Sequence, residues 1–248
     1  MVRIYIVALT LSLAGCTLSA KEIPAASTRT LKIAPQNAHT LDKLGNYPNL
    51  EILRISCLEG LQALPDSIGK LPKLKELIID NGNGCTMNPI LPESIGNLES
   101  LEKLVLYGAQ DPRKPGDPDD LPQKNRHKFP ASMSRLKNLV YLDLGRNGLS
   151  ELPSFVKDLP KLRELGFAWN MRLKEIPKFI TELHELTTLK LDSDGLSDLP
   201  DFLNTLPKLS RITLGNNCVI TQSPSKKKQL RKRFPRIAFD FQDEYDCP

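Results

Sequence analysis

Residues 64–74 read LPDSIGKLPKL, and variants of this stretch recur along the chain. A second pattern, LxxLxL, alternates with it. Its first leucines at 139, 162, 186 and 209 lie 23, 24 and 23 residues apart, and Leu50, Leu74 and Leu101 extend the series upstream. A period of this length, kept in phase, indicates a solenoid in which each repeat forms one coil. The paired residues that open the first pattern are Leu64-Pro65, Leu91-Pro92, Leu152-Pro153, Ile176-Pro177 and Leu199-Pro200.

The two patterns predict the path of each coil. Alternation in LxxLxL predicts a short strand with its leucines inward and its other residues outward. Proline after leucine ends the strand and directs the chain to the convex side. One position after each LxxLxL pattern, the amide slot, suits a side-chain amide that forms hydrogen bonds with buried backbone groups at the turn. It is filled by Asn147, Asn170, Asp194 and Asn217.

The repeats over about residues 28–241 resemble the 23-residue class of leucine-rich repeats (LPxxIGxLxxLxxLxL) found in bacterial and plant proteins. This resemblance implies an α/β solenoid with a concave parallel β-sheet and short helical or extended segments on the convex side. We expect the repeat domain with its end caps to occupy residues 28–248, with a first strand at 30–33 and a last one at 234–239. The basic run 226–233 is either a solvated cap helix or a contact for an anionic membrane or lipopolysaccharide.

The N-terminus has the features of an export signal. A basic start precedes an apolar segment of about ten residues, too short to cross a bilayer. Leu13-Ala14-Gly15-Cys16 resembles the lipobox of bacterial lipoproteins. It implies a signal peptide at 1–15, lipid attachment (palmitate and related acyl groups) at Cys16 and a linker at 16–27. Thr17, not Asp, follows the cysteine, and this resembles the outer-membrane sorting pattern of Gram-negative lipoproteins. The alternative is an ordinary secretory signal with a cysteine there by chance.

Four cysteines remain after Cys16, which allows three pairings. Cys57 and Cys218 follow strands six apart, so about 29 Å should separate them, beyond the reach of a disulfide. Cys57 and Cys85 follow neighbouring strands, as do Cys218 and Cys247. We therefore predict two disulfides, Cys57–Cys85 and Cys218–Cys247, with four free thiols as the alternative.

Sequence motifs for catalysis are lacking. His184-Glu185 has no second histidine to complete HExxH, and no GxSxG, Walker or GxGxxG motif occurs. The stretch 192–195 begins like a calcium loop but has no closing glutamate. A net charge of +5, from 34 basic and 29 acidic residues, is too small for a dedicated nucleic-acid binder. We expect no enzyme, no cofactor, no metal and no nucleic acid.

The spacing from Leu101 to Leu139 is 38 residues, about fifteen more than in the neighbouring repeats. The excess predicts a loop insertion at 107–128 on the concave rim, which is either functional or disordered. Phe129-Pro130 then replaces the usual Leu-Pro pair.

Outward positions of the strands, and those just after them, carry residue types enriched at interface hot spots. We therefore expect a membrane-anchored protein of the bacterial cell envelope whose concave face binds a protein partner. The alternatives are a structural envelope protein and a secreted virulence effector that binds a host protein. The candidate partner-binding residues are Tyr107, Tyr141, Asp143, Arg146, Trp169, Lys190 and Asp192.

Overall fold

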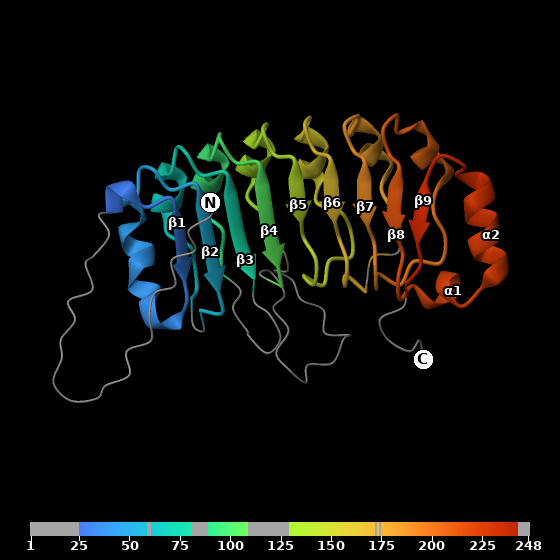
Figure 1. The fold of residues 1–248 in the computed structure, drawn as a ribbon, viewed down its shortest axis with the longest axis horizontal. Coiled ribbons are helices and arrows are strands. Elements are labelled where there is room, and N and C mark those ends of the chain that lie inside the picture. Colours follow the sequence, from blue (N-terminus) through green and yellow to red (C-terminus); the bar gives the residue numbers. More distant parts are fainter. Residues whose placement is uncertain are drawn as a thin grey trace.

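The computed structural model describes residues 25–58, 61–80, 89–108, 129–171, 173 and 175–242. Within them, nine strands form one parallel sheet whose order follows the chain (Figure 1). The predicted solenoid with a parallel sheet is confirmed. The strands are β1 (Thr30–Ile33), β2 (Ile52–Ser56), β3 (Glu76–Asp80), β4 (Lys103–Tyr107), β5 (Tyr141–Asp143), β6 (Glu164–Gly166), β7 (Thr188–Lys190), β8 (Arg211–Thr213) and β9 (Ala238–Asp240).

The register of the sheet follows the LxxLxL frame. Leu53 is paired with Leu77, and Leu77 with Leu104. The same column continues through Leu142 and Leu165. All five are fully buried, because side chains that point inward at one register position stack on their equivalents in the next coil. The inward columns therefore form one continuous core along the solenoid.

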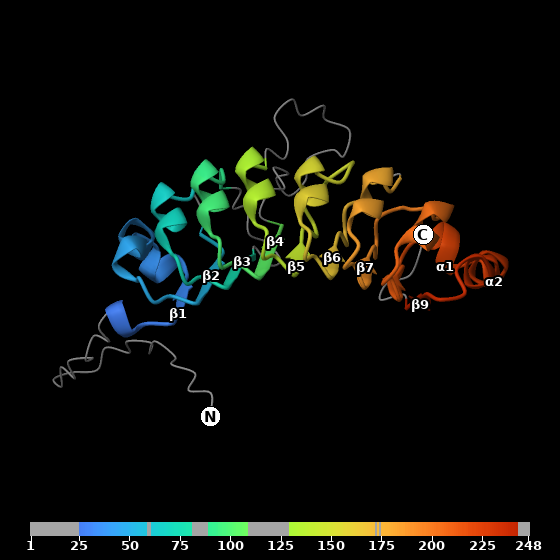
Figure 2. The same cartoon turned by 90° about the horizontal axis from the view of Figure 1, so that it is seen from above.

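Short 3-10 helices form the convex side, where Figure 2 shows them along the outside of the arc. A proline precedes each of the six central ones, and its extended backbone ends the approach from the sheet. Phe129-Pro130 takes the place of Leu-Pro before η5, as predicted. These helices are η3 (Asp66–Lys70), η4 (Glu93–Asn97), η5 (Ala131–Arg135), η6 (Ser154–Asp158), η7 (Lys178–Glu182) and η8 (Asp201–Thr205).

Both ends of the solenoid carry helical caps. At the start, η1 (Ala25–Ser27) and η2 (Pro35–Asn46) flank the first strand, which lies at Thr30–Ile33 as predicted. At the end, α1 (Cys218–Thr221) and α2 (Pro224–Arg233) precede β9. The predicted last strand, 234–239, was placed too early. Phe234 instead packs in the core, and only the end of that stretch is extended, with Phe239 in register with Ile212.

The predicted amide slot is confirmed as a buried ladder. Asn170 Oδ1 accepts from the backbone N–H groups of Asn147 and Leu149, both at 3.0 Å. Its Nδ2 donates to carbonyl oxygens of two successive coils, those of Leu144 and Phe167. One side chain thus satisfies four buried backbone groups, which an apolar residue could not do. The ladder consists of Asn147, Asn170, Asp194 and Asn217, all fully buried.

Candidate functional site

The concave face carries a small apolar centre of two neighbouring side chains, Ile78 and Val105, between Arg54 and Asp143 in the same register column. Ile78, Val105 and Asp143 lie in register on β3, β4 and β5, at positions that point away from the core. Ile78 and Val105 remain half-buried on this face. Protein interfaces commonly have an apolar centre surrounded by polar and aromatic side chains. This pair is the apolar part of such a surface.

Tyr141 lies beside this centre, between two lysines. The Nζ atoms of Lys103 and Lys190 lie 5.1 Å and 4.9 Å from the centroid of its ring. Lys190 Nζ also donates to the Tyr141 hydroxyl at 3.4 Å and forms an ion pair of 3.3 Å with Glu164. These contacts join side chains from four consecutive strands, β4 to β7. They hold two flexible lysines and an aromatic ring in fixed positions on the concave face.

Asp143 is held by its own coil and by the tyrosine. Its Oδ1 accepts from the backbone N–H of Gly145 at 2.9 Å, and the Tyr141 hydroxyl donates to Oδ2 at 3.4 Å. The carboxyl group lies over Gly166 on the next strand, where a Cβ atom would come within 2.9 Å of it. Glycine at 166 thus leaves room for Asp143 above β6.

Burial affects the pKa values of Asp143, Tyr141 and Lys190 in this cluster. The pKa of Asp143 is raised chiefly by burial, which outweighs the Gly145 hydrogen bond and the nearby Lys190 charge. Burial also raises the pKa of Tyr141. For Lys190 burial is the largest effect and acts to lower the pKa, yet the pKa is raised because Tyr141 and Glu164 together outweigh it. The lysine therefore stays positively charged within the cluster.

Tyr107 and Asp192 pack more tightly than their outward positions suggest. The Tyr107 ring lies against Gly145, where a Cβ atom would be 2.8 Å from the ring edge. Asp192 accepts from the Thr213 hydroxyl and, at 2.7 Å, from the backbone N–H of Gly215. These hydrogen bonds tie the Asp192 carboxylate to the following coil, so its main role is to join coils.

Arg146 and Trp169 lie beyond the strands, at the edge where the strands end. Both have left-handed backbone, with φ of 57° and 67°. Their N–H groups donate to carbonyl oxygens of the next coil, those of Ala168 and Asp192. Both side chains are half-buried. They border the concave face at this edge rather than lying within the sheet.

Four residues of the site were missed by the sequence reasoning: Ile78, Val105, Lys103 and Glu164. The first two are hidden in the uninterrupted apolar runs of β3 and β4, where outward and inward residues look alike. Lys103 and Glu164 occupy the same register column as Tyr141. Following that column through every repeat would have found both.

Other predicted sites fall partly outside the described residues. Cys57 and Cys218 lie within the described residues, whereas Cys85 and Cys247 lie outside them, so the two disulfides stay predictions. Cys16, the signal peptide and positions 109–128 of the insertion also lie outside it. Within the described ranges, no helix is long and apolar enough to cross a membrane. The same residues contain no group of three or more side chains suited to a metal ion.

Comparison with known proteins identifies the fold. No protein-family model and no curated protein matches the chain. Among solved structures, InlP of Listeria monocytogenes is 22% identical with a TM-score of 0.53, covering 77% of this chain and 50% of its own. Internalin C2 of the same species is 22% identical (TM-score 0.48, 69% and 64% covered). A leucine-rich repeat protein of Leptospira interrogans is 26% identical (TM-score 0.45, 81% and 57% covered).

The class of the fold follows from the sheet and from this likeness. Nine parallel strands in chain order, with one repeat per strand, define a leucine-rich repeat solenoid, and the fold of InlP agrees with it. The chain spans between half and two thirds of the length of the three solved proteins. The repeats of such a solenoid expose a broad concave surface.

Proposed function

We propose that the protein is a lipid-anchored component of a bacterial cell envelope that binds a protein partner through its concave face. The observation that carries the proposal is the apolar centre formed by Ile78 and Val105, bordered by the Tyr141–Lys190 cluster. A partner that covers this surface would bury aliphatic, aromatic and charged groups together, as protein interfaces do. The side chains there are already held by mutual contacts, so ordering them on binding costs little entropy.

The anchor rests on the lipobox-like stretch ending at Cys16. Two or more acyl chains hold a protein on a bilayer stably, whereas one chain binds marginally. The native protein and a Cys16→Ala variant should be compared by intact mass and by membrane partitioning. Loss of residues 1–15 with acyl mass on Cys16, and release of the variant from membranes, would support the anchor. An unacylated soluble chain would contradict it and favour the secreted effector.

The concave site is tested separately by co-isolation of partners from detergent-solubilised envelopes. Val105→Asp places a negative charge in the apolar centre, and the control Lys157→Asp places an aspartate on η6, on the convex side, with a net-charge change of two units instead of one. Both positions tolerate a charged side chain sterically because both point out of the core. We expect the first variant to lose a partner that the wild type and the control retain. Equal recovery with all three proteins would favour a structural envelope role.

A further inference from the structure

The described part of the C-terminal cap, residues 218–242, is strongly basic. The full sequence has 34 Lys and Arg against 29 Asp and Glu, a net charge of +5. Seven of the basic residues and one of the acidic residues lie within 218–242, a net charge of +6 for that segment. The rest of the chain, with 27 basic and 28 acidic residues, is nearly neutral. The described part of the cap is therefore positive, and Asp243, Glu244 and Asp246, which follow it in the sequence, bring the net charge of 218–248 to +3.

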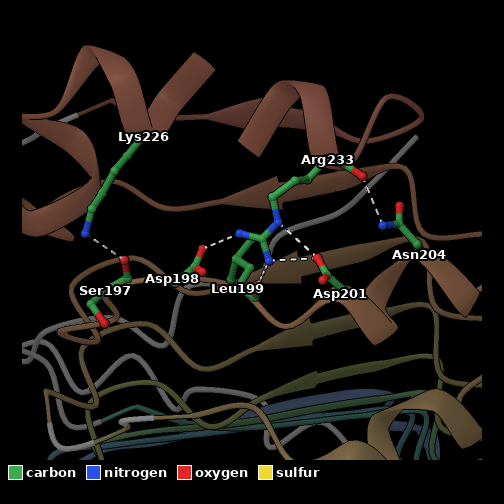
Figure 3. Close-up of polar contacts among 7 residues, drawn as sticks. All are labelled: Ser197, Asp198, Leu199, Asp201, Asn204, Lys226 and Arg233. Carbon is green, nitrogen blue, oxygen red and sulfur yellow. Dashed lines mark hydrogen bonds and ion pairs between the residues drawn. The ribbon is translucent and has the colours of Figure 1, made fainter. Parts of the chain in front are cut away.

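The inner face of α2 attaches the cap to the preceding coil. Leu230 is buried in the core, and Arg233 forms ion pairs of 2.7 Å with Asp198 and 2.8 Å with Asp201 (Figure 3). Lys226 donates to the carbonyl oxygen of Ser197 at 3.2 Å. Positions 226, 230 and 233 share one side of a helix. The cations on this side have structural partners.

The other cations of α2 form an outer stripe at positions 227, 228, 231 and 232. Lys227 and Arg231 flank the Phe241 ring, at 5.5 Å and 5.2 Å from its centroid. Lys228 and Lys232 are exposed, and neither has an acidic partner among the described residues. The stripe thus presents four positive charges with no acidic neighbour on the helix itself.

The lysines in the first half of α2 work against the stability of the helix, whereas Arg231, Lys232 and Arg233 lie in its last turn, where the dipole favours positive charge. Lys226, Lys227 and Lys228 lie near its N-terminus, where the helix dipole disfavours positive charge. Within each of the pairs 227/231 and 228/232 the two positive charges repel each other, because side chains four residues apart are neighbours on a helix. A cap helix needs only its inner face to cover the core. Lys228 and Lys232 are exposed and have no acidic partner among the described residues, so these two charges are not explained by the fold and indicate a function outside it.

We propose that the outer stripe of α2 docks the C-terminal end of the solenoid onto an anionic lipid bilayer. Arg233 is held in its ion pairs, and Arg236 donates to the carbonyl oxygen of Asn204. The unpaired charges are mainly lysines, which act as point charges rather than as the planar forks that recognise individual phosphates or carboxylates. They suit a surface of many mobile headgroups. The preference for lipid over nucleic acid rests on the proposed export of the chain.

An apolar side chain lies in the same cap. Val219 on α1, which packs against α2, is 52% exposed. Basic residues beside an exposed aliphatic side chain are typical of segments that lie at a membrane surface. The docking surface is independent of the concave face, so its test does not depend on a protein partner.

The test uses the full chain carrying Cys16→Ser, which removes the candidate acylation site. Binding is measured to vesicles of phosphatidylcholine alone and to vesicles with about 30% phosphatidylglycerol, at low and at high salt. We expect preferential binding to the anionic vesicles that high salt abolishes. Neutral vesicles account for any contribution of the apolar N-terminus.

The stripe is tested by Lys227→Gln, Lys228→Gln and Lys232→Gln together. Each basic residue near an anionic surface strengthens binding about fivefold, so we expect a loss of about 100-fold. The control removes three exposed lysines from the convex side, Lys70, Lys157 and Lys178, each replaced by Gln. It should bind within about twofold of the parent, since charges far from the bilayer are screened. Circular dichroism checks that both variants fold.

Three results would overturn the proposal. One is equal binding to neutral and anionic vesicles. Another is an equal loss in both triple variants, which would mean that only net charge matters. The third is tighter binding to a duplex DNA oligonucleotide than to the anionic vesicles at the same salt. None of these results bears on Cys16 acylation or on the concave face.

Discussion

Asn170 and Asp194 occupy equivalent positions in successive coils, and the backbone N–H of Asn170 donates to Asp194 Oδ1 at 2.8 Å. The second oxygen, Asp194 Oδ2, is buried and has no hydrogen-bond partner in the described part of the chain. In Asn170 the corresponding atom is an amide nitrogen that donates to two carbonyl oxygens. A carboxylate cannot donate there, whereas a neutral carboxyl group can. Burial raises the pKa of Asp194 well above its usual range.

The first prediction is that Asp194→Asn stabilises the protein near neutral pH by about 1–3 kcal/mol, since the amide supplies the missing donors. The folded-state pKa of Asp194 is raised, so its stabilising contribution is complete below the unfolded-state pKa of about 3.9. That contribution is lost as pH rises through the folded-state pKa. The advantage of the variant should therefore grow as pH rises from about 4. Urea unfolding at several pH values measures it.

The reverse change provides the control. Asn170→Asp removes the two donors from the neighbouring slot and should make the protein less stable near neutral pH than at acid pH. If Asp194→Asn shows the same difference from wild type at every pH, the buried carboxyl group is not the cause.

A second prediction concerns the close approach of Tyr107 to Gly145. A Cβ atom at 145 would lie 2.8 Å from the Tyr107 ring and 3.0 Å from the carbonyl oxygen of Ala168. Gly145→Ala should therefore cost about 1–3 kcal/mol of unfolding free energy, as overpacking does. At Gly45 an added Cβ meets nothing within 4 Å, so Gly45→Ala is the matched control. Equal denaturation midpoints for the two variants would refute the contact.

A third prediction is the disulfide pattern. Cys57 and Cys218 are six strands apart, about 29 Å, so they do not bond to each other. Peptide mapping under non-reducing conditions should yield Cys57–Cys85 and Cys218–Cys247. Reduction should lower the free energy of unfolding by about 2–4 kcal/mol per bridge. Peptides that join Cys57 to Cys247, or four alkylated cysteines in the native chain, would rule the pattern out.

The repeat pattern predicted the architecture because each coil has the same local requirements. Leucine columns, prolines before the convex segments and the amide slot all follow from spacing alone. The contact between Lys190 and Tyr141 does not, because it spans the intervening strand β6. Whether two side chains meet across a strand depends on side-chain length and conformation rather than on periodicity. The same holds for the missed apolar pair, whose outward direction depends on register.

We propose that a protein partner covers the concave face of the solenoid. The most direct measurement uses two variants of the full chain in the producing cells. One carries a photo-reactive phenylalanine derivative at Val105, and the other carries it at Lys157 on the convex side. We expect irradiation to give one covalent protein adduct of defined mass from position 105 and none from 157. The same adduct from both positions, or none from either in a folded and exported chain, would contradict the claim.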